Sequence, residues 1–285
     1  MNPAPPPAGR SAGAFLLFFL AVTGLFSQRV VSLAPGLTEI VFAIDCGGSL
    51  VGVTKFCDYP QAAREIDKIG GFLDISMEAL VALAPDIVLA YPEHANRLKF
   101  LPAQVRVVTV RHDRLSELLR SIAEIGQALN REKEASRLQE AIRARLQRVA
   151  RRMRGKRKVS TLCIAGRNAD ELKNMFIIGR NDFLNDLLEI AGGTNAYKGD
   201  IDYPNISLES VIALQPEFIL EISSHYEGIA DQRIFALWHP LGMVPAVARR
   251  QVRVIKDPSW LRPGPRVGRV AEELAALLHG SGRLP

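Results

Sequence analysis

The sequence is sparing in the residues that build disulfide frameworks and metal sites. Its 285 residues include three cysteines and five histidines. Three cysteines do not make a disulfide framework. Cys46 and Cys57 are separated by only ten residues, so they can pair in an oxidising compartment, or they stay as thiols. There is no CxxC pair, and no two histidines have the spacing of metal ligands on a helix. We therefore expect no metal site.

Enzyme signatures are missing as well. The sequence contains no GxSxG elbow, no P-loop and no HExxH motif. We therefore expect no catalytic residues and no cofactor. An exported α/β enzyme is kept only as a distant alternative, because the requirements of an active site are not met.

The N-terminal segment lacks an apolar run long enough to span a bilayer comfortably. The first 27 residues carry one charge, Arg10, followed by the thirteen-residue apolar run 14–26. That length is typical of the hydrophobic region of a secretory signal. Residues 1–27 are therefore predicted to be a signal peptide, which places the mature protein in the periplasm. An uncleaved membrane anchor is the alternative. No cysteine directly follows the run, which argues against a lipoprotein anchor.

A cluster of basic residues occupies positions 143–158 and ends in RRMRGKRK. Apolar residues recur through this region at helical spacing: Leu138, Ile142, Leu146, Val149 and Met153. The charges therefore form the solvated face of an amphipathic helix. No aromatic residues are interleaved for base stacking, so we expect no nucleic acid partner.

One sixteen-residue stretch occurs twice, at residues 75–90 (ISMEALVALAPDIVLA) and 206–221 (ISLESVIALQPEFILE). In each copy a serine caps a short helix, and a glutamate in the first turn interacts favourably with the helix dipole. A proline then ends the helix. The matched positions are Ser76 and Ser207, Glu78 and Glu209, Pro85 and Pro216. A continuous apolar run follows each proline, as in a buried parallel strand. The repeat predicts two similar lobes.

The rest of the chain alternates between strand and helix patterns, which favours parallel sheets covered by helices. Strands are predicted at 30–33, 51–53, 87–90, 105–110, 159–164, 218–222 and 252–255, and helices at 37–46, 115–129, 183–190 and 267–278. We expect an N-terminal α/β lobe at 28–129, one long rigid helix at 130–155, and a C-terminal α/β lobe at 156–285. Asn130 is predicted to cap the long helix and Gly155 to end it.

The loops after the predicted strands are the expected place for a ligand, because α/β sheets bind ligands at the carboxyl ends of their strands. These loops, at 34–36, 55–60, 91–96, 222–226 and 257–266, carry several aromatic side chains. A cleft lined in this way between two lobes suits a large, partly apolar ligand. His94 and His225 fall on equivalent loops of the two lobes. They either meet at the ligand or are simply solvated.

Several segments together resemble the periplasmic substrate-binding proteins of ABC importers that have a helical backbone and serve cobalamin and ferric siderophores. The matching segments are RVVSLAPGLTEIVFA, VGVTKFCDYP, GGFLDISMEALVALAPDIVLA, FLNDLLEIAGGTN, ISLESVIALQPEFIL and PGPRVGRVAEEL. The resemblance covers about residues 29–279 and is strongest to the cobalamin-binding branch. It implies a monomeric two-lobe clamp that closes only slightly, because the long helix resists hinge motion.

The resemblance also implies roles for individual residues. The cleft aromatics of the family match Phe56, Phe72, Tyr203 and Trp260, and Arg266 matches a recurrent arginine beside the cleft. Glu78 and Glu209 stand where the family places the glutamates that dock on the two permease subunits. The function implied is delivery of cobalamin or a related corrinoid to an ABC importer. A carrier of a ferric siderophore, haem or another iron chelate is the alternative.

Overall fold

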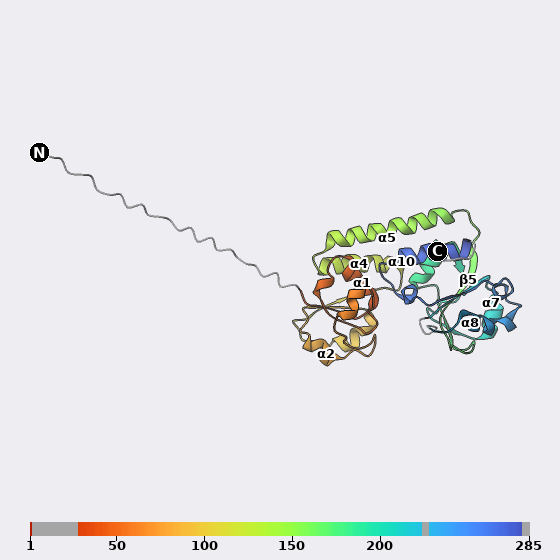
Figure 1. Cartoon of the computed structure of the whole chain (residues 1–285), viewed down its shortest axis with the longest axis horizontal. Helices are drawn as coiled ribbons and strands as arrows, with labels where there is room; N and C mark the ends of the chain where they lie inside the picture. Colours follow the sequence, from red (N-terminus) through yellow and green to blue (C-terminus); the bar gives the residue numbers. More distant parts are fainter. Residues whose placement is uncertain (2–27, 224–227, 281–285) are drawn as a thin grey trace.

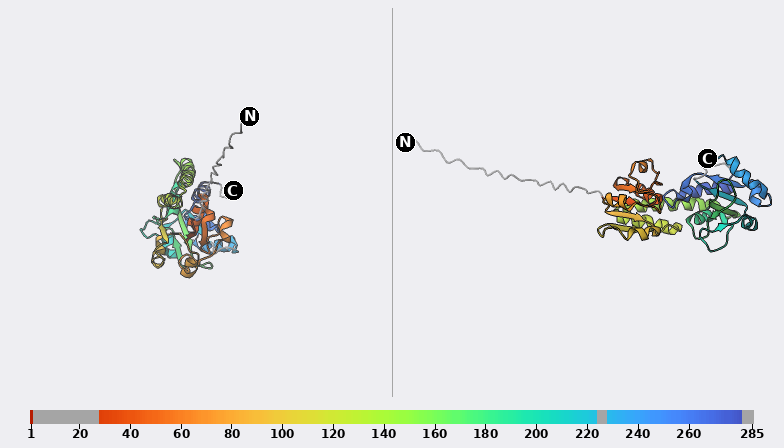
Figure 2. Two further views of the ribbon diagram at one scale, coloured as in Figure 1. Left: turned by 90° about the vertical axis from the view of Figure 1, so that its left-hand side faces the viewer. Right: turned by 90° about the horizontal axis from the view of Figure 1, so that it is seen from below.

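A computed structural model describes Met1 and residues 28–223 and 228–280 of the chain. The predicted signal peptide beyond Met1, and His225, therefore lie outside the described residues. Two α/β lobes lie side by side beneath one long helix, α5 (Figure 1). Seen from below, the lobes occupy opposite ends of the long axis of the molecule (Figure 2). Within the described part of the chain, no helix combines the length and apolarity needed to cross a membrane.

The N-terminal lobe is built on a four-stranded parallel sheet with the strand order β2-β1-β3-β4. Its strands are β1 (Val30–Ser32), β2 (Leu50–Val53), β3 (Ile87–Ala90) and β4 (Arg106–Thr109), and its helices are α1 (Pro35–Ala43), α2 (Met77–Ala82), α3 (Ala95–Leu98) and α4 (Leu115–Ala128). Every residue of β3 is buried, as its continuous apolar run predicts. The parallel arrangement confirms the predicted fold class for this half.

The C-terminal lobe contains a mixed sheet with the order β10-β9-β5-β6-β8, with β7 also paired to β5. Its strands are β5 (Val159–Gly166), β6 (Met175–Ile177), β7 (Gly193–Asn195), β8 (Asn205–Ile206), β9 (Phe218–Ile222) and β10 (Val252–Ile255), and its helices are α6 (Phe183–Ile190), α7 (Leu208–Leu214), α8 (Asp231–Trp238), α9 (Pro245–Ala248) and α10 (Val267–His279). Strands β5, β7, β9 and β10 pair in parallel, whereas β6 and β8 pair antiparallel at one edge. The sequence patterns missed β6, β7, β8, α8 and α9. The three strands are too short to show a clear period.

Both copies of the repeat form the predicted capped helix followed by a buried strand. The Ser76 hydroxyl accepts a hydrogen bond from the Ala79 N–H at 3.2 Å, and the Ser207 hydroxyl accepts one from the Ser210 N–H at 3.3 Å. Each helix ends before its proline, as predicted. Ala84 and Gln215, the residues before the two prolines, have left-handed backbones with φ values of 41° and 45°, so both leave the right-handed α region.

Helix α5 (Glu132–Met153) has 22 residues, so it is about 33 Å long. The predicted cap is wrong: Asn130 has a φ of 55°, and Arg131 occupies the capping position without a side-chain hydrogen bond. Asn tolerates the left-handed conformation, which turns the chain sharply between α4 and α5. Gly155 has a φ of 78° just after the end of α5, which confirms its predicted role.

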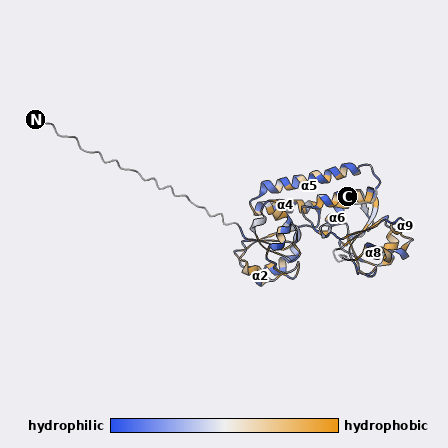
Figure 3. Ribbon diagram, viewed as in Figure 1, coloured by the Kyte–Doolittle hydropathy of each residue, from blue (hydrophilic) through white to orange (hydrophobic). Residues whose placement is uncertain are grey.

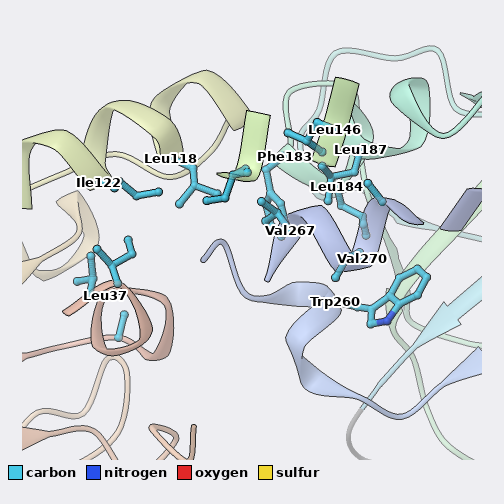
Figure 4. Packing of buried hydrophobic residues seen from close by; sticks show 14 of the residues in the cluster. Leu37, Leu118, Ile122, Leu146, Phe183, Leu184, Leu187, Trp260, Val267 and Val270 are labelled. Atoms are coloured by element: carbon cyan, nitrogen blue, oxygen red, sulfur yellow. The ribbon is translucent and has the colours of Figure 1, made fainter. Parts of the chain in front are cut away.

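The two lobes are joined by more than α5, so the prediction of a single connecting helix is incomplete. Helix α10 packs against both α5 and α6. The largest buried cluster runs without interruption from Leu37 and Leu118 in the N-terminal lobe to Leu184 and Val267 in the C-terminal half (Figure 4). A continuous core of this kind holds the lobes in a fixed relation.

Three arginine–carboxylate pairs also cross between the lobes. Arg114 pairs with Asp186, Arg262 with Asp58, and Arg266 with Glu39, each with a shortest nitrogen–oxygen distance of 2.5 Å. Each arginine also makes a second hydrogen bond to the same carboxylate. Such paired geometry fixes orientation as well as distance.

Candidate functional site

A cavity of about 320 Å³ lies where the carboxyl ends of the N-terminal strands face the segment that follows β10. Its walls are largely apolar. They come from the predicted loops and include Pro35, Phe56, Phe72, Tyr91, Leu261 and Arg262. The position agrees with the expectation for an α/β sheet. The structure thus brings together Phe56 and Phe72, two of the predicted ligand-binding aromatics, at one cavity.

The floor of the cavity is a close backbone contact between the lobes at Gly36. A Cβ atom at this position would lie 2.1 Å from the carbonyl oxygen of Pro263 and 2.9 Å from the hydroxyl of Tyr91. Only glycine allows this approach. The PGL and PGPR segments of the sequence therefore meet in space and set the width of the cleft.

His94 holds Phe72 in place from behind the cavity wall. The buried His94 ring accepts a hydrogen bond from the Tyr91 N–H through Nδ1 at 3.0 Å. Its Nε2 is therefore the protonated nitrogen and donates to the Phe72 carbonyl, also at 3.0 Å. The two rings meet edge to face at 4.8 Å. His94 is thus neither solvated nor at the cleft surface; it positions the loop that carries Phe72.

Tyr203 lies apart from the cavity lining. Its ring is 53% exposed, and its hydroxyl donates a hydrogen bond to Asp182. Burial raises the pKa of Asp182 to about 6, although the hydrogen bond from Tyr203 opposes that shift. The structure therefore places Tyr203 on the C-terminal lobe, beside the cap of α6 and outside the cavity that holds Phe56 and Phe72.

Trp260 needs a correction. Its side chain is 1% exposed and belongs to the core, and its Nε1–H donates to Glu273 at 3.1 Å. Trp260 is not among the residues that line the cavity. The tryptophan instead anchors the loop before α10 to that helix.

Arg266 also differs from its expected role. Its guanidinium binds Glu39 through two hydrogen bonds and lies 4.3 Å from the centre of the Tyr59 ring. Glu39 occupies the paired N–H groups of the guanidinium that a ligand phosphate would need, and Tyr59 covers its flat face. Arg266 therefore connects α10 to α1 and is not free to bind a ligand.

The cavity is also lined by Tyr91, from the predicted loop 91–96, and by His112 and Arg262, which were not predicted as site residues. Tyr91 and His112 follow β3 and β4, so the rule on strand ends points to them. The Tyr91 and His112 rings lie 3.9 Å apart. Arg262 lies in the predicted loop 257–266, but nothing local in the sequence points to its ion pair, because Asp58 is 204 residues away.

The three cysteines are free thiols, so Cys46 and Cys57 do not pair in this structure. Cys57 is buried and accepts a hydrogen bond from the Thr38 hydroxyl at 3.1 Å. Among the described residues, one group of possible metal ligands lies beside the cavity, where Glu93, His112 and Asp113 offer atoms within 4.8 Å of one another. Asp113 pairs with Arg111 at 2.8 Å, whereas His112 Nε2 lies 3.4 Å from Glu93 and has no hydrogen-bond partner among the described residues.

The predicted docking residues Glu78 and Glu209 are both exposed, one on each lobe. Each lies in the first turn of its helix, α2 or α7. A hydrogen bond with Ser207 lowers the pKa of Glu209, which keeps this carboxylate charged. In Figure 1, α2 lies on the side of the N-terminal lobe away from α5.

Replacing His94 with phenylalanine is expected to reduce stability by about 1–3 kcal/mol at pH 8, because the Tyr91 N–H and the Phe72 carbonyl lose their partner. Burial lowers the pKa of His94 below its usual 6.5. The neutral ring therefore stabilises the fold fully above pH 6.5, and this contribution is lost as the pH falls toward the lowered value. Urea unfolding from pH 8 to 5 should show the difference between native protein and variant shrinking. An unchanged difference would contradict the role, and the exposed His239→Asn serves as the control.

The comparisons with known proteins agree with this architecture. A family model described as periplasmic binding protein matches residues 30–258. A vitamin B12-binding protein of Vibrio campbellii is 27% identical over 247 residues, which are 84% of this chain and 85% of that protein. The crystal structure of a periplasmic heme binding protein from Pseudomonas aeruginosa has a TM-score of 0.77 at 27% identity, covering 90% of this chain and 94% of the other. The vitamin B12 binding protein BtuF of Vibrio cholerae has a TM-score of 0.75 at 23% identity, covering 88% and 96%, and that likeness shows the fold.

Proposed function

The chain belongs to the family of periplasmic binding proteins, and on this premise we propose that it captures cobalamin or a related corrinoid in the cleft and delivers it to an ABC importer. Members of this family are substrate-binding proteins without enzymatic activity, so the alternative of an exported enzyme is set aside. What such a protein carries is a transported ligand and not a cofactor. We further propose that it acts as a monomer and that residues 1–27 serve as its export signal.

The observation that supports a corrinoid is an apolar cavity in which the positive charge of the lining arginine is balanced by a carboxylate. Phe56 and Phe72 present flat apolar surface, which suits a macrocycle. Among the described residues that line the cavity, Arg262 is the one arginine, and its guanidinium is paired with Asp58. An anionic iron chelate needs unpaired cations, whereas the amide side chains of cobalamin are neutral. Cobalamin also brings its own axial ligands, so its metal needs none from the protein.

Haem is the second candidate, because a solved structure 27% identical to this chain is that of a heme binding protein. A haem iron takes an axial ligand from the protein. Tyr91 and His112 line the cavity, and His112 Nε2 is buried without a hydrogen-bond partner among the described residues, 3.4 Å from a carboxylate oxygen of Glu93. The cavity therefore includes residue types that can ligate a haem iron, and our preference for the corrinoid rests on the apolar lining and on the neutralised Arg262.

Calorimetric titration with cyanocobalamin, haemin and a ferric siderophore tests this proposal directly. We expect micromolar or tighter binding of cyanocobalamin and much weaker binding of the other two. Phe72→Ala should weaken cobalamin binding by about 10- to 100-fold, because an aromatic wall worth about 1.5–3 kcal/mol is lost. Phe100→Ala is the matched control, since Phe100 is 78% exposed and is not part of the cavity lining. Absence of heat with cyanocobalamin at high concentration rules out the corrinoid, and tight haemin binding would favour the second candidate.

Delivery is proposed to depend on Glu78 and Glu209. Supporting this proposal, the two carboxylates are exposed at matched positions of the repeat. The permease partners are those that the family implies.

A further inference from the structure

The second half of α5 and the loop that follows it form an array of one charge sign. Residues 141–158 contain nine arginines and lysines and no aspartate or glutamate. The cations, which we call the basic strip, are Arg143, Arg145, Arg148, Arg151, Arg152, Arg154, Lys156, Arg157 and Lys158. Cleft binding and permease docking use none of these residues.

Most of the basic strip lacks a neutralising partner. Arg145 and Arg148 share Glu272, and Arg157 pairs with Glu217. For the other six cations, no ion pair is formed with any carboxylate in the part of the chain that the structure describes. All nine are exposed. Repulsion between unpaired like charges costs stability, so an array of this kind is best explained by an anionic partner.

The strip lies along the outer side of a straight helix. The buried face of α5 carries Ala135, Ile142, Leu146 and Val149 and packs on α4 and α10. Most of α5 is coloured as hydrophilic in Figure 3. An α-helix that presents its cations outward along an edge of the molecule offers them to an extended surface and not to a small ligand in a pocket.

We propose that the basic strip binds the surface of a membrane that contains anionic phospholipids. Each cation near such a surface strengthens binding by about fivefold, so several unpaired cations together give a substantial affinity. Nucleic acid is disfavoured because the strip has no aromatic residues for stacking and the family is periplasmic.

Membrane contact through this face has a consequence for delivery. Helix α5 and helix α2, which bears Glu78, lie on opposite sides of the N-terminal lobe (Figure 1). A protein lying on the membrane through α5 therefore turns Glu78 away from that membrane. The strip would hold the protein near the membrane in an orientation that excludes docking. This consequence rests on the proposed docking role, whereas membrane binding itself does not.

The test is co-sedimentation of the exported protein, purified from the periplasm, with vesicles of phosphatidylcholine with and without about one third phosphatidylglycerol. The variant Arg143→Gln/Arg151→Gln/Arg152→Gln/Arg154→Gln removes four unpaired charges and keeps good helix formers. The matched control, Arg97→Gln/Lys99→Gln/Arg106→Gln/Arg120→Gln, removes four exposed charges from the N-terminal lobe. Both variants have the same net charge.

We expect the native protein and the control to bind phosphatidylglycerol vesicles, with binding weakened by salt. The strip variant should bind at least about 100-fold more weakly, with an unchanged melting temperature. Equal losses in the two variants would mean that net charge alone is responsible and would overturn the proposal. So would native binding no stronger with phosphatidylglycerol than without it, or binding to duplex DNA but not to vesicles. None of these results bears on ligand affinity, so a failure here is distinct from a failure of the proposed cargo.

Discussion

Replacing both Glu78 and Glu209 with alanine is expected to reduce transport to background while leaving the Kd for the ligand unchanged. The two carboxylates lie on α2 and α7, outside the cavity lining. Their loss removes the charges proposed to meet the permease, one from each lobe. The fold should change little, because a first-turn acid contributes only about 0.3–1 kcal/mol to its helix.

Two measurements on the same variant separate delivery from capture. Uptake of labelled ligand by cells reports delivery, and calorimetry on the purified protein reports capture. The matched control is Glu124→Ala/Glu140→Ala, which removes two exposed glutamates from α4 and α5. Uptake at the native level in the Glu78/Glu209 variant would show that these positions do not dock. A weaker Kd would show instead that they act at the ligand.

Replacing Arg266 with methionine is expected to destabilise the protein by about 3–5 kcal/mol at pH 7, because it leaves the Glu39 carboxylate buried without its partner. Glu39 is 4% exposed and Arg266 provides two hydrogen bonds to it. Urea unfolding followed by circular dichroism measures the loss. The double variant Glu39→Met/Arg266→Met should recover most of it, because no unpaired charge is then buried.

The pH dependence of the Arg266→Met variant gives a second readout. Burial raises the pKa of Glu39, and Arg266 is the main influence that opposes this rise. Without Arg266 the folded pKa rises further, so protonation stabilises the variant as the pH falls. Its deficit should therefore shrink between pH 7 and pH 5. If the variant is as stable as the native protein but binds ligand poorly, Arg266 is a ligand contact after all.

The features that the sequence predicted well are those encoded by neighbouring residues. Ser76 and Ser207 cap their helices as expected, because an N-cap needs only a side chain and an N–H three residues later. The central strands β3 and β9 also follow from short apolar runs. In contrast, β6 and β8 have three and two residues, which is too short for an alternating pattern to show.

The sequence by itself determined the two-lobe α/β architecture, the family and the exposed glutamates of the repeat, because each depends on local patterns repeated along the chain. Only the tertiary structure decided which aromatics and arginines face the cleft. Trp260 and Arg266 look suitable for a ligand until the fold supplies Glu273 and Glu39 as partners. Glu39 lies 227 residues from Arg266, and no local pattern encodes a pairing at that separation. Burial and ion pairing are properties of what the folded chain brings into contact.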